Sequence, residues 1–154
     1  MSISASEVAM NLLSGAGFGR FCFDTGFALD FVRPASVRDS AANLRLDLNS
    51  EWSMGTRESW SRLVSSFPVS SVEVCEPVQA ACLAALRWSE GAIVVDVQLV
   101  GPDIHVYFEN GQMLRTVVDP AMEGPAWRLA GTQRGQELAI ASEGGGISMF
   151  GTPE

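Results

Sequence analysis

The strongest constraint on how this chain folds is an Asn-Gly pair between two alternating apolar segments. Residues 104–108 precede Asn110-Gly111, and residues 113–117 follow it. Asn-Gly readily adopts the two positive φ angles of a type I′ turn, and alternation with a period of two is typical of strands. The segment therefore predicts a β-hairpin.

The two-residue turn also fixes which side chains of this hairpin face each other. Phe108 is expected opposite Met113, and Val106 opposite Arg115. The intervening residues share the reverse face. Both faces are mostly apolar, so we expect the strand pair to be covered on both sides.

A similar pattern occurs earlier in the chain, where residues 23–29 align with residues 108–114 through shared Phe, Gly and Leu positions. Two explanations stay open: an internal duplication, or the chance likeness of two hairpins that each turn at a glycine. A duplication would divide a single domain, 1–154, into halves of about 1–68 and 76–151 that share one core.

Two short helices are expected between these hairpins. Apolar residues at helical spacing follow a capping residue, Thr56, and the segment stops before Pro68. The second helix opens at Glu76-Pro77, because proline is tolerated at the first helical position, and we expect Gly91 to end it.

The remaining segments read mostly as strands. Leucines alternate with polar residues over 44–49, so the leucines are expected to face inward. The N-terminal segment 3–13 starts with a Ser-x-x-Glu capping box and favours a helix, although a true repeat would make it a strand. Further strands are expected at 71–75, 92–100, 127–131, 136–141 and 146–150. The sequence thus predicts an α+β fold: antiparallel β-rich sheets built from two similar hairpin units, with two short helices between them.

The charge balance restricts the class of partner. All ten basic residues are Arg, against 18 Asp and Glu, for a net charge of −8. Such a field repels phosphate backbones and anionic lipid, so we expect neither a nucleic acid nor a membrane as partner. It suits a basic protein, although an acidic balance also serves solubility alone. Hydrophobic residues are 47% of the chain and charged ones 18%, which favours an apolar surface that needs a partner.

Cysteine usage and the first residues suggest the compartment. The three cysteines, Cys22, Cys75 and Cys82, are an odd number, and residues 1–15 lack the basic and apolar regions of a signal peptide. The longest apolar runs fall far short of a membrane span. We therefore expect a cytoplasmic protein with reduced thiols.

Motifs for catalysis or cofactor binding are scarce. The single histidine, His105, lies in an apolar strand without a recognisable catalytic partner. The sequence has no CxxC or HExxH motif that would suggest a metal site. Because it has no lysine, Schiff-base chemistry and a Walker lysine are excluded. The glycines at 15, 17 and 19 precede a strand, where a phosphate loop would precede a helix. We expect no metal, no cofactor and no enzymatic activity.

Acidic side chains and tryptophans are the candidate partner-binding residues. Trp52 and Trp88 lie near element ends, where an aromatic can either close the core or anchor a partner. We expect the partner face to combine the outward positions of the first hairpin and of strand 44–49 with nearby acids. The candidate residues are Asp24, Asp30, Asp47, Glu51, Trp52 and Glu58.

The segment from Leu83 onward resembles a small β-rich actinobacterial-type domain family of unknown function. The resemblance lies in the F-x-N-G-x-x-L hairpin at 108–114, the Trp-x-Leu strand at 127–129 and the Gly-Gly turn before Phe150. The resemblance is close over about 70 residues. With a weaker match over residues 21–48, it extends to most of the chain. The chain departs from the family pattern in that Glu123 lies one position farther from the tryptophan, and phenylalanine replaces the terminal tryptophan.

Small acidic domains of this type resemble bacterial immunity proteins, which neutralise a toxin by occluding its active site. The resemblance implies a cognate protein toxin with a basic surface as partner and supplies no catalytic residues. The alternative is a non-catalytic β-rich structural or regulatory module that forms a homodimer. A third reading, an enzyme that uses convergent carboxylates, has no support from spacing.

Overall fold

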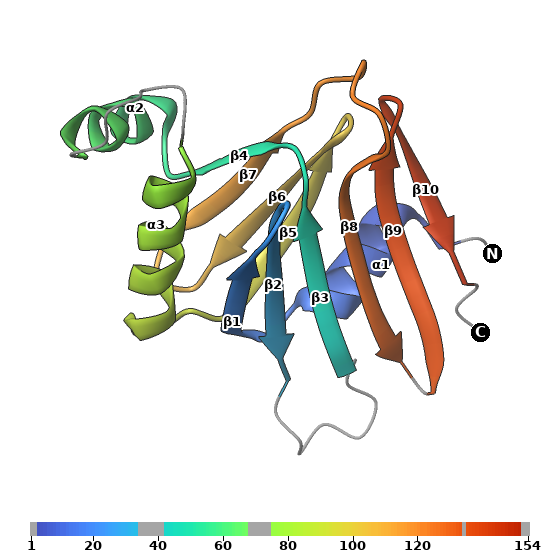
Figure 1. Cartoon of the computed structure of the whole chain (residues 1–154). Coiled ribbons are helices and arrows are strands. Elements are labelled where there is room, and N and C mark those ends of the chain that lie inside the picture. The colour runs from blue at the N-terminus through green and yellow to red at the C-terminus, as the bar shows by residue number, and fades with distance from the viewer. Residues whose placement is uncertain (1–2, 34–41, 68–74, 134, 152–154) are drawn as a thin grey trace.

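The computed structural model describes residues 3–33, 42–67, 75–133 and 135–151. In these residues the chain forms three helices and ten strands in two antiparallel sheets, which confirms the predicted β-rich α+β class (Figure 1). The strand predicted at 71–75 lies, apart from Cys75, outside the described residues.

The larger sheet, sheet A, has six strands. In spatial order they are β1 (Gly17–Phe23), β2 (Phe27–Val32), β3 (Ala42–Leu48), β8 (Pro125–Gln133), β9 (Gln136–Glu143) and β10 (Gly146–Phe150). The alternation in β3 behaves as predicted, because Leu44, Leu46 and Leu48 are buried. Their polar neighbours point to the opposite face, which none of the three helices covers (Figure 1).

The smaller sheet, sheet B, has four strands and packs against one part of sheet A. In spatial order they are β4 (Glu51–Met54), β7 (Met113–Val117), β6 (Asp103–Phe108) and β5 (Val94–Val100). The chain passes from β3 to β4 through Asn49 and Ser50, whose backbone N–H groups both donate to the carbonyl of Ala126 at 2.9 Å. A β-bridge between Gly17 and Ile93 joins the two sheets on the other side.

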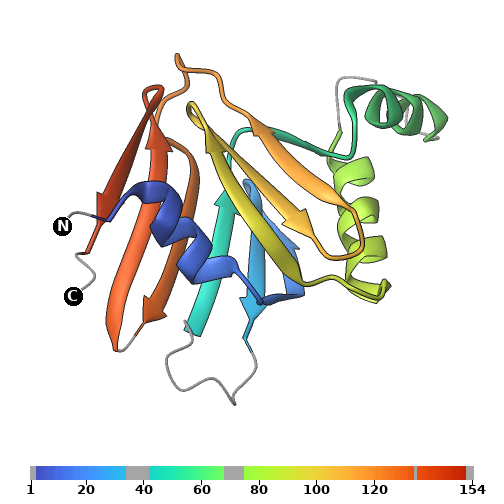
Figure 2. The same cartoon turned by 180° about the vertical axis from the view of Figure 1, so that it is seen from behind.

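Helix α1 (Ala5–Leu13) covers the part of sheet A that sheet B leaves open (Figure 2). Its capping box forms as predicted: the backbone N–H of Glu7 donates to the Ser4 hydroxyl, and the Glu7 carboxylate accepts from the backbone of Ser4. The hydrogen bonds that this carboxylate accepts from the backbone N–H and the hydroxyl of Ser4 lower the pKa of Glu7. The helical reading of this segment is therefore confirmed and the strand alternative is wrong.

The two helices between the hairpins lie at one side of the molecule (Figure 1). Helix α2 (Arg57–Ser66) begins after Thr56, whose hydroxyl accepts from the Ser59 N–H, as predicted. Helix α3 (Glu76–Trp88) has a proline in its first turn and ends three residues before Gly91, which differs from the predicted stop. It ends there because the side chain and the backbone N–H of Ser89 both donate to the Leu86 carbonyl.

One cluster of buried apolar residues fills the space between the sheets and α1, with members from both halves of the chain. Phe27 and Trp52 meet edge to face in this cluster, with ring centroids 5.2 Å apart.

The two hairpins that suggested a duplication both turn through three residues. Gly111 in the second turn has a positive φ, whereas Gly26 in the first does not. The duplication stays a prediction.

The hairpin at Asn110 forms, but its predicted turn type and register are wrong. Gly111 has φ 87°, whereas Asn110 has no positive φ, and Phe108 N–H donates to the Gln112 carbonyl. The loop is therefore a three-residue turn that ends in a left-handed glycine. The Asn110 side chain explains this, because its Oδ1 accepts from Gln112 N–H and its Nδ2 donates to the Ser89 hydroxyl.

The three-residue loop shifts the pairing of the two strands by one position. Val106 lies opposite Leu114, and both are buried. His105 lies opposite Arg115 on the outer face of sheet B, where both are half-exposed. The expectation of two covered apolar faces is wrong for this face.

The inner face of β9 contains a buried hydroxyl without a partner, which gives a stability test. Ser142 is fully buried opposite Trp127, and its Oγ has no hydrogen-bond partner among the described residues. Ser142→Ala removes this unpaired polar group, so we expect the free energy of unfolding to rise by about 1 kcal/mol in urea titrations. Ser148→Ala, on exposed β10, is the matched control and should change it by less than about 0.5 kcal/mol. A loss of stability specific to Ser142→Ala would show that the Ser142 hydroxyl has a partner and contributes to the fold.

Candidate functional site

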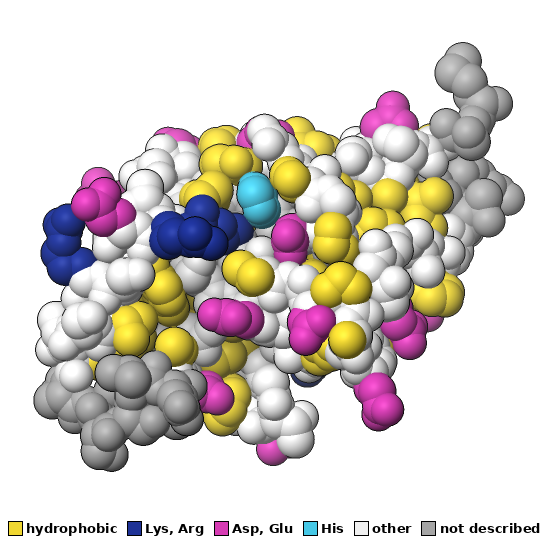
Figure 3. Space-filling model, turned by 90° about the horizontal axis from the view of Figure 1, so that it is seen from above, with side chains coloured by type: hydrophobic (Ala, Val, Ile, Leu, Met, Phe, Trp, Pro, Cys, Tyr) yellow, Lys and Arg dark blue, Asp and Glu magenta, His cyan; other side chains and the backbone are white. Residues whose placement is uncertain are grey.

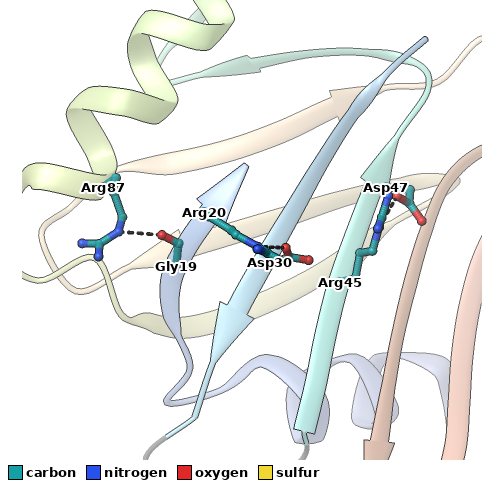
Figure 4. Close-up of polar contacts among 6 residues, drawn as sticks. All are labelled: Gly19, Arg20, Asp30, Arg45, Asp47 and Arg87. Carbon is teal, nitrogen blue, oxygen red and sulfur yellow. Dashed lines mark hydrogen bonds and ion pairs between the residues drawn. The ribbon is translucent and has the colours of Figure 1, made fainter. Parts of the chain in front are cut away.

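Two of the predicted partner-binding acids lie on the uncovered face of sheet A, and both are matched by arginines (Figure 4). Arg20 Nε lies 2.6 Å from an Asp30 carboxylate oxygen, and Arg45 Nε lies 2.8 Å from an Asp47 oxygen. The hydrogen bond to Asp30 raises the pKa of Arg20. Arg128 lies opposite Asp47 on the next strand. The charge on this face is therefore largely balanced.

The prediction of Trp52 as a partner-binding residue is wrong, and the alternative that it closes the core is confirmed. Its side chain is 1% exposed and packs on Phe27, and its backbone carbonyl accepts from the buried Gln79 amide at 2.8 Å. Trp52 closes the core where β4 meets α3. The exposed tryptophan is Trp88 at the end of α3, at 86%, with the Arg87 guanidinium 5.8 Å from the centre of its ring.

Glu58 is also separate from the acids of sheet A. It lies on α2, one turn before Arg62, and their charged atoms are 3.9 Å apart. Helix α2 packs beside β4 at the edge of sheet B (Figure 1). The structure therefore distributes the six predicted residues over four locations.

Asp24 and Glu51 lie at the end of the sandwich where several strand connections meet. Asn49 donates from its side chain to the Pro125 carbonyl, and Pro125 pairs with Glu143. Glu51 pairs with Val117, which leads into the β7–β8 loop. We call this surface the acidic end and define it by five exposed carboxylates: Asp24, Glu51, Asp119, Glu123 and Glu143.

The acidic end differs from the face of sheet A in that its carboxylates are not neutralised. Among the described residues, no ion pair joins any of the five to an arginine or to the histidine. Exposed apolar side chains accompany them: Phe23 is 50% exposed, Val117 53% and Val100 49%. Figure 3 looks down on the molecule from this side and shows acidic and apolar side chains interspersed.

Three of the five acidic-end residues, Asp119, Glu123 and Glu143, were not predicted as site residues. They lie in or next to turns, a position that does not distinguish them from other surface acids in the sequence. Strand pairing brings their loops towards Asp24 and Glu51: β4 pairs with β7, β3 with β8, and β8 with β9.

Two of the three cysteines, Cys75 and Cys82, are partly buried, which makes their thiols weak nucleophiles. Burial raises the pKa of Cys82 and, with nearby Glu51 and Glu76, that of Cys75, so both remain protonated at neutral pH. Within the described ranges, no three His, Cys, Asp or Glu side chains gather closely enough to hold a metal ion. The helices of the described residues are all too short or too polar to cross a membrane.

No protein-family model, curated protein or solved structure matches the chain. Function is therefore inferred from the charge and geometry of these surfaces.

Trp52 is buried and Trp88 is exposed, so we expect their replacement by alanine to change the free energy of unfolding by different amounts. Trp52→Ala should lower the free energy of unfolding by about 3–5 kcal/mol, because it leaves a large cavity between the sheets. Trp88→Ala, the matched control, should change it by less than about 0.5 kcal/mol. Urea unfolding followed by circular dichroism measures both, and Trp52→Phe replaces Trp52→Ala if the alanine variant does not fold. Equal changes in the free energy of unfolding at the two positions would contradict the assignment of Trp52 to the core and Trp88 to the surface.

Proposed function

We propose that this chain is a bacterial immunity or antitoxin protein that binds a cognate toxin through the acidic end. The observation that supports this most directly is the distribution of charge. Acids on the face of sheet A have arginine partners, whereas Asp24, Glu51 and their neighbours have none among the described residues. Unmatched carboxylates attract a basic protein surface and accelerate its encounter.

Exposed apolar side chains give this surface a means of holding the partner. Phe23 is half-exposed, yet its ring lies 4.8 Å from Phe27, which in turn contacts Trp52. An aromatic ring held by the core loses little conformational entropy on binding. A basic catalytic surface of a toxin, covered by this end, would be closed to its substrate. We place this encounter in the cytoplasm.

The direct experiment is co-expression with the product of the neighbouring gene. The proposed function requires that the two proteins copurify and that the chain restores growth of cells that make the toxin. A neighbouring toxin that neither copurifies with the chain nor is neutralised by it would refute the function.

Charge reversal locates the interface. Glu51→Lys combined with Glu123→Lys should weaken toxin binding at least about tenfold and flatten its dependence on salt, because unlike charges become like charges. Glu137→Lys, at the other end of β9, is the matched control and should leave the dissociation constant within about twofold. Calorimetry at two ionic strengths measures both effects. If Asp47→Lys weakens binding and the acidic-end variant does not, the interface is the face of sheet A.

A second candidate function, a module that forms a homodimer, is favoured by strand β10. This edge strand contains no charged residue, and Met149 and Phe150 are 47% and 54% exposed. The other edges are protected: Arg87 donates to a β1 carbonyl, Gln79 donates to a β4 carbonyl, and α1 lies along β5. Within the described residues, no hydrogen bond reaches the free side of β10.

The homodimer reading predicts that two β10 strands pair across a twofold axis. Light scattering at micromolar concentration should then give twice the chain mass, and Met149→Lys should give the monomer. Val32→Lys, an equally apolar exposed position on β2, is the matched control and should remain dimeric. A monomeric parent chain would contradict this candidate.

A further inference from the structure

A second surface, on the outer face of sheet B, adjoins the acidic end at Glu51 and Val117 but also contains arginines. An open cleft of about 700 Å³ lies there against α2. We call it the arginine cleft and define it by Ser53, Arg57, Trp60, His105 and Arg115. Figure 3 shows arginine side chains gathered beside the histidine on this side of the molecule.

The floor of the arginine cleft is a row of paired strand residues. Ser53 of β4 lies opposite Arg115 of β7, and Arg115 lies opposite His105 of β6. The Ser53 side chain is largely buried, and its hydroxyl accepts from Arg115 Nε at 3.4 Å. This contact orients the guanidinium, and the structure gives its two terminal nitrogens no partner among the described residues.

The arginines of the cleft form no ion pair with Glu51 or Asp103, the two acids that line it, among the described residues. Neither Arg57 nor Arg115 forms an ion pair within the described residues. Asp103 is already engaged, because its Oδ1 accepts from the Val118 N–H at 2.8 Å and from the Thr116 hydroxyl at 3.1 Å. Glu51 also lines the cleft and is the carboxylate that competes with an anionic ligand for the arginines.

We propose that the arginine cleft binds a compact ligand with a phosphate or carboxylate group attached to a flat ring. Arginine presents a fork of N–H donors that matches the oxygens of either group, and His105 adds a further donor or acceptor. The indole of Trp60 lines the wall and offers a surface for the ring. A volume of about 700 Å³ lies within the usual range of small-molecule sites, about 300–1,000 Å³.

This inference goes beyond the proposed function, because it concerns a small anion and not a basic protein. The two surfaces meet at Glu51, which attracts a cationic partner and opposes an anionic ligand. Replacement of Glu51 should therefore weaken toxin binding and strengthen anion binding. This opposite response separates failure of one proposal from failure of the other.

Calorimetric titration of the purified chain with four probes tests the inference: adenosine monophosphate, benzoate, inorganic phosphate and uncharged adenosine. We expect saturable binding of adenosine monophosphate, of benzoate, or of both, weaker binding of phosphate, and no binding of adenosine. Binding of only one of the first two probes identifies which combination of ring and oxyanion the cleft accepts. If neither binds, the proposal is overturned.

Substitutions locate the bound probe. Arg115→Met should weaken binding about tenfold, and Glu51→Gln should tighten it. Arg128→Met, an exposed arginine on the face of sheet A, is the matched control and should have no effect. Circular dichroism checks that each variant folds, and Ser53→Ala is the milder alternative if Arg115→Met does not. Equal losses from the Arg115 and Arg128 variants would overturn the proposal.

Discussion

The structure depends on the apolar contact between the two sheets where the chain passes from β3 to β4. Leu48 ends one strand and Trp52 lies in the next, and both are buried in the same cluster. The intervening Asn49 and Ser50 donate their backbone N–H groups to the Ala126 carbonyl, so the crossing leaves neither amide unpaired. Phe27 meets the Trp52 ring from sheet A, and these contacts fix how sheet B lies on sheet A.

This arrangement decides which polar residues share a surface. Asp30 of β2 and Arg45 and Asp47 of β3 reach the uncovered face of sheet A, where arginines and aspartates lie opposite one another. The carboxylates of the acidic end form no ion pairs with arginines among the described residues, so the excess negative charge of the chain lies at that end. The outer face of sheet B instead places Arg115 beside His105.

Much of the fold follows from local patterns. The alternating leucines of β3, the capping box of α1 and the Thr56 cap of α2 each involve neighbours in sequence, and each was predicted correctly. The candidate site was predicted less well. A period-two pattern shows that Asp30 and Asp47 point outward, but it does not show that Arg20 and Arg128 face them, because these arginines lie on neighbouring strands. Trp52 likewise looked peripheral because it lies near an element end.

The sequence by itself determined the β-rich class, most strand and helix positions and the excess of acid, because each depends on residue type and near neighbours. It did not predict β4, which is only four residues long. Only the tertiary structure decided the register of the β6–β7 hairpin. Asn110 bonds both to Gln112 and to Ser89 beyond α3, and these contacts select a three-residue loop over the two-residue turn. That single-position shift places Arg115 opposite His105 and so forms the floor of the arginine cleft. Strand pairing across sheet A similarly brings distant loops together as the acidic end.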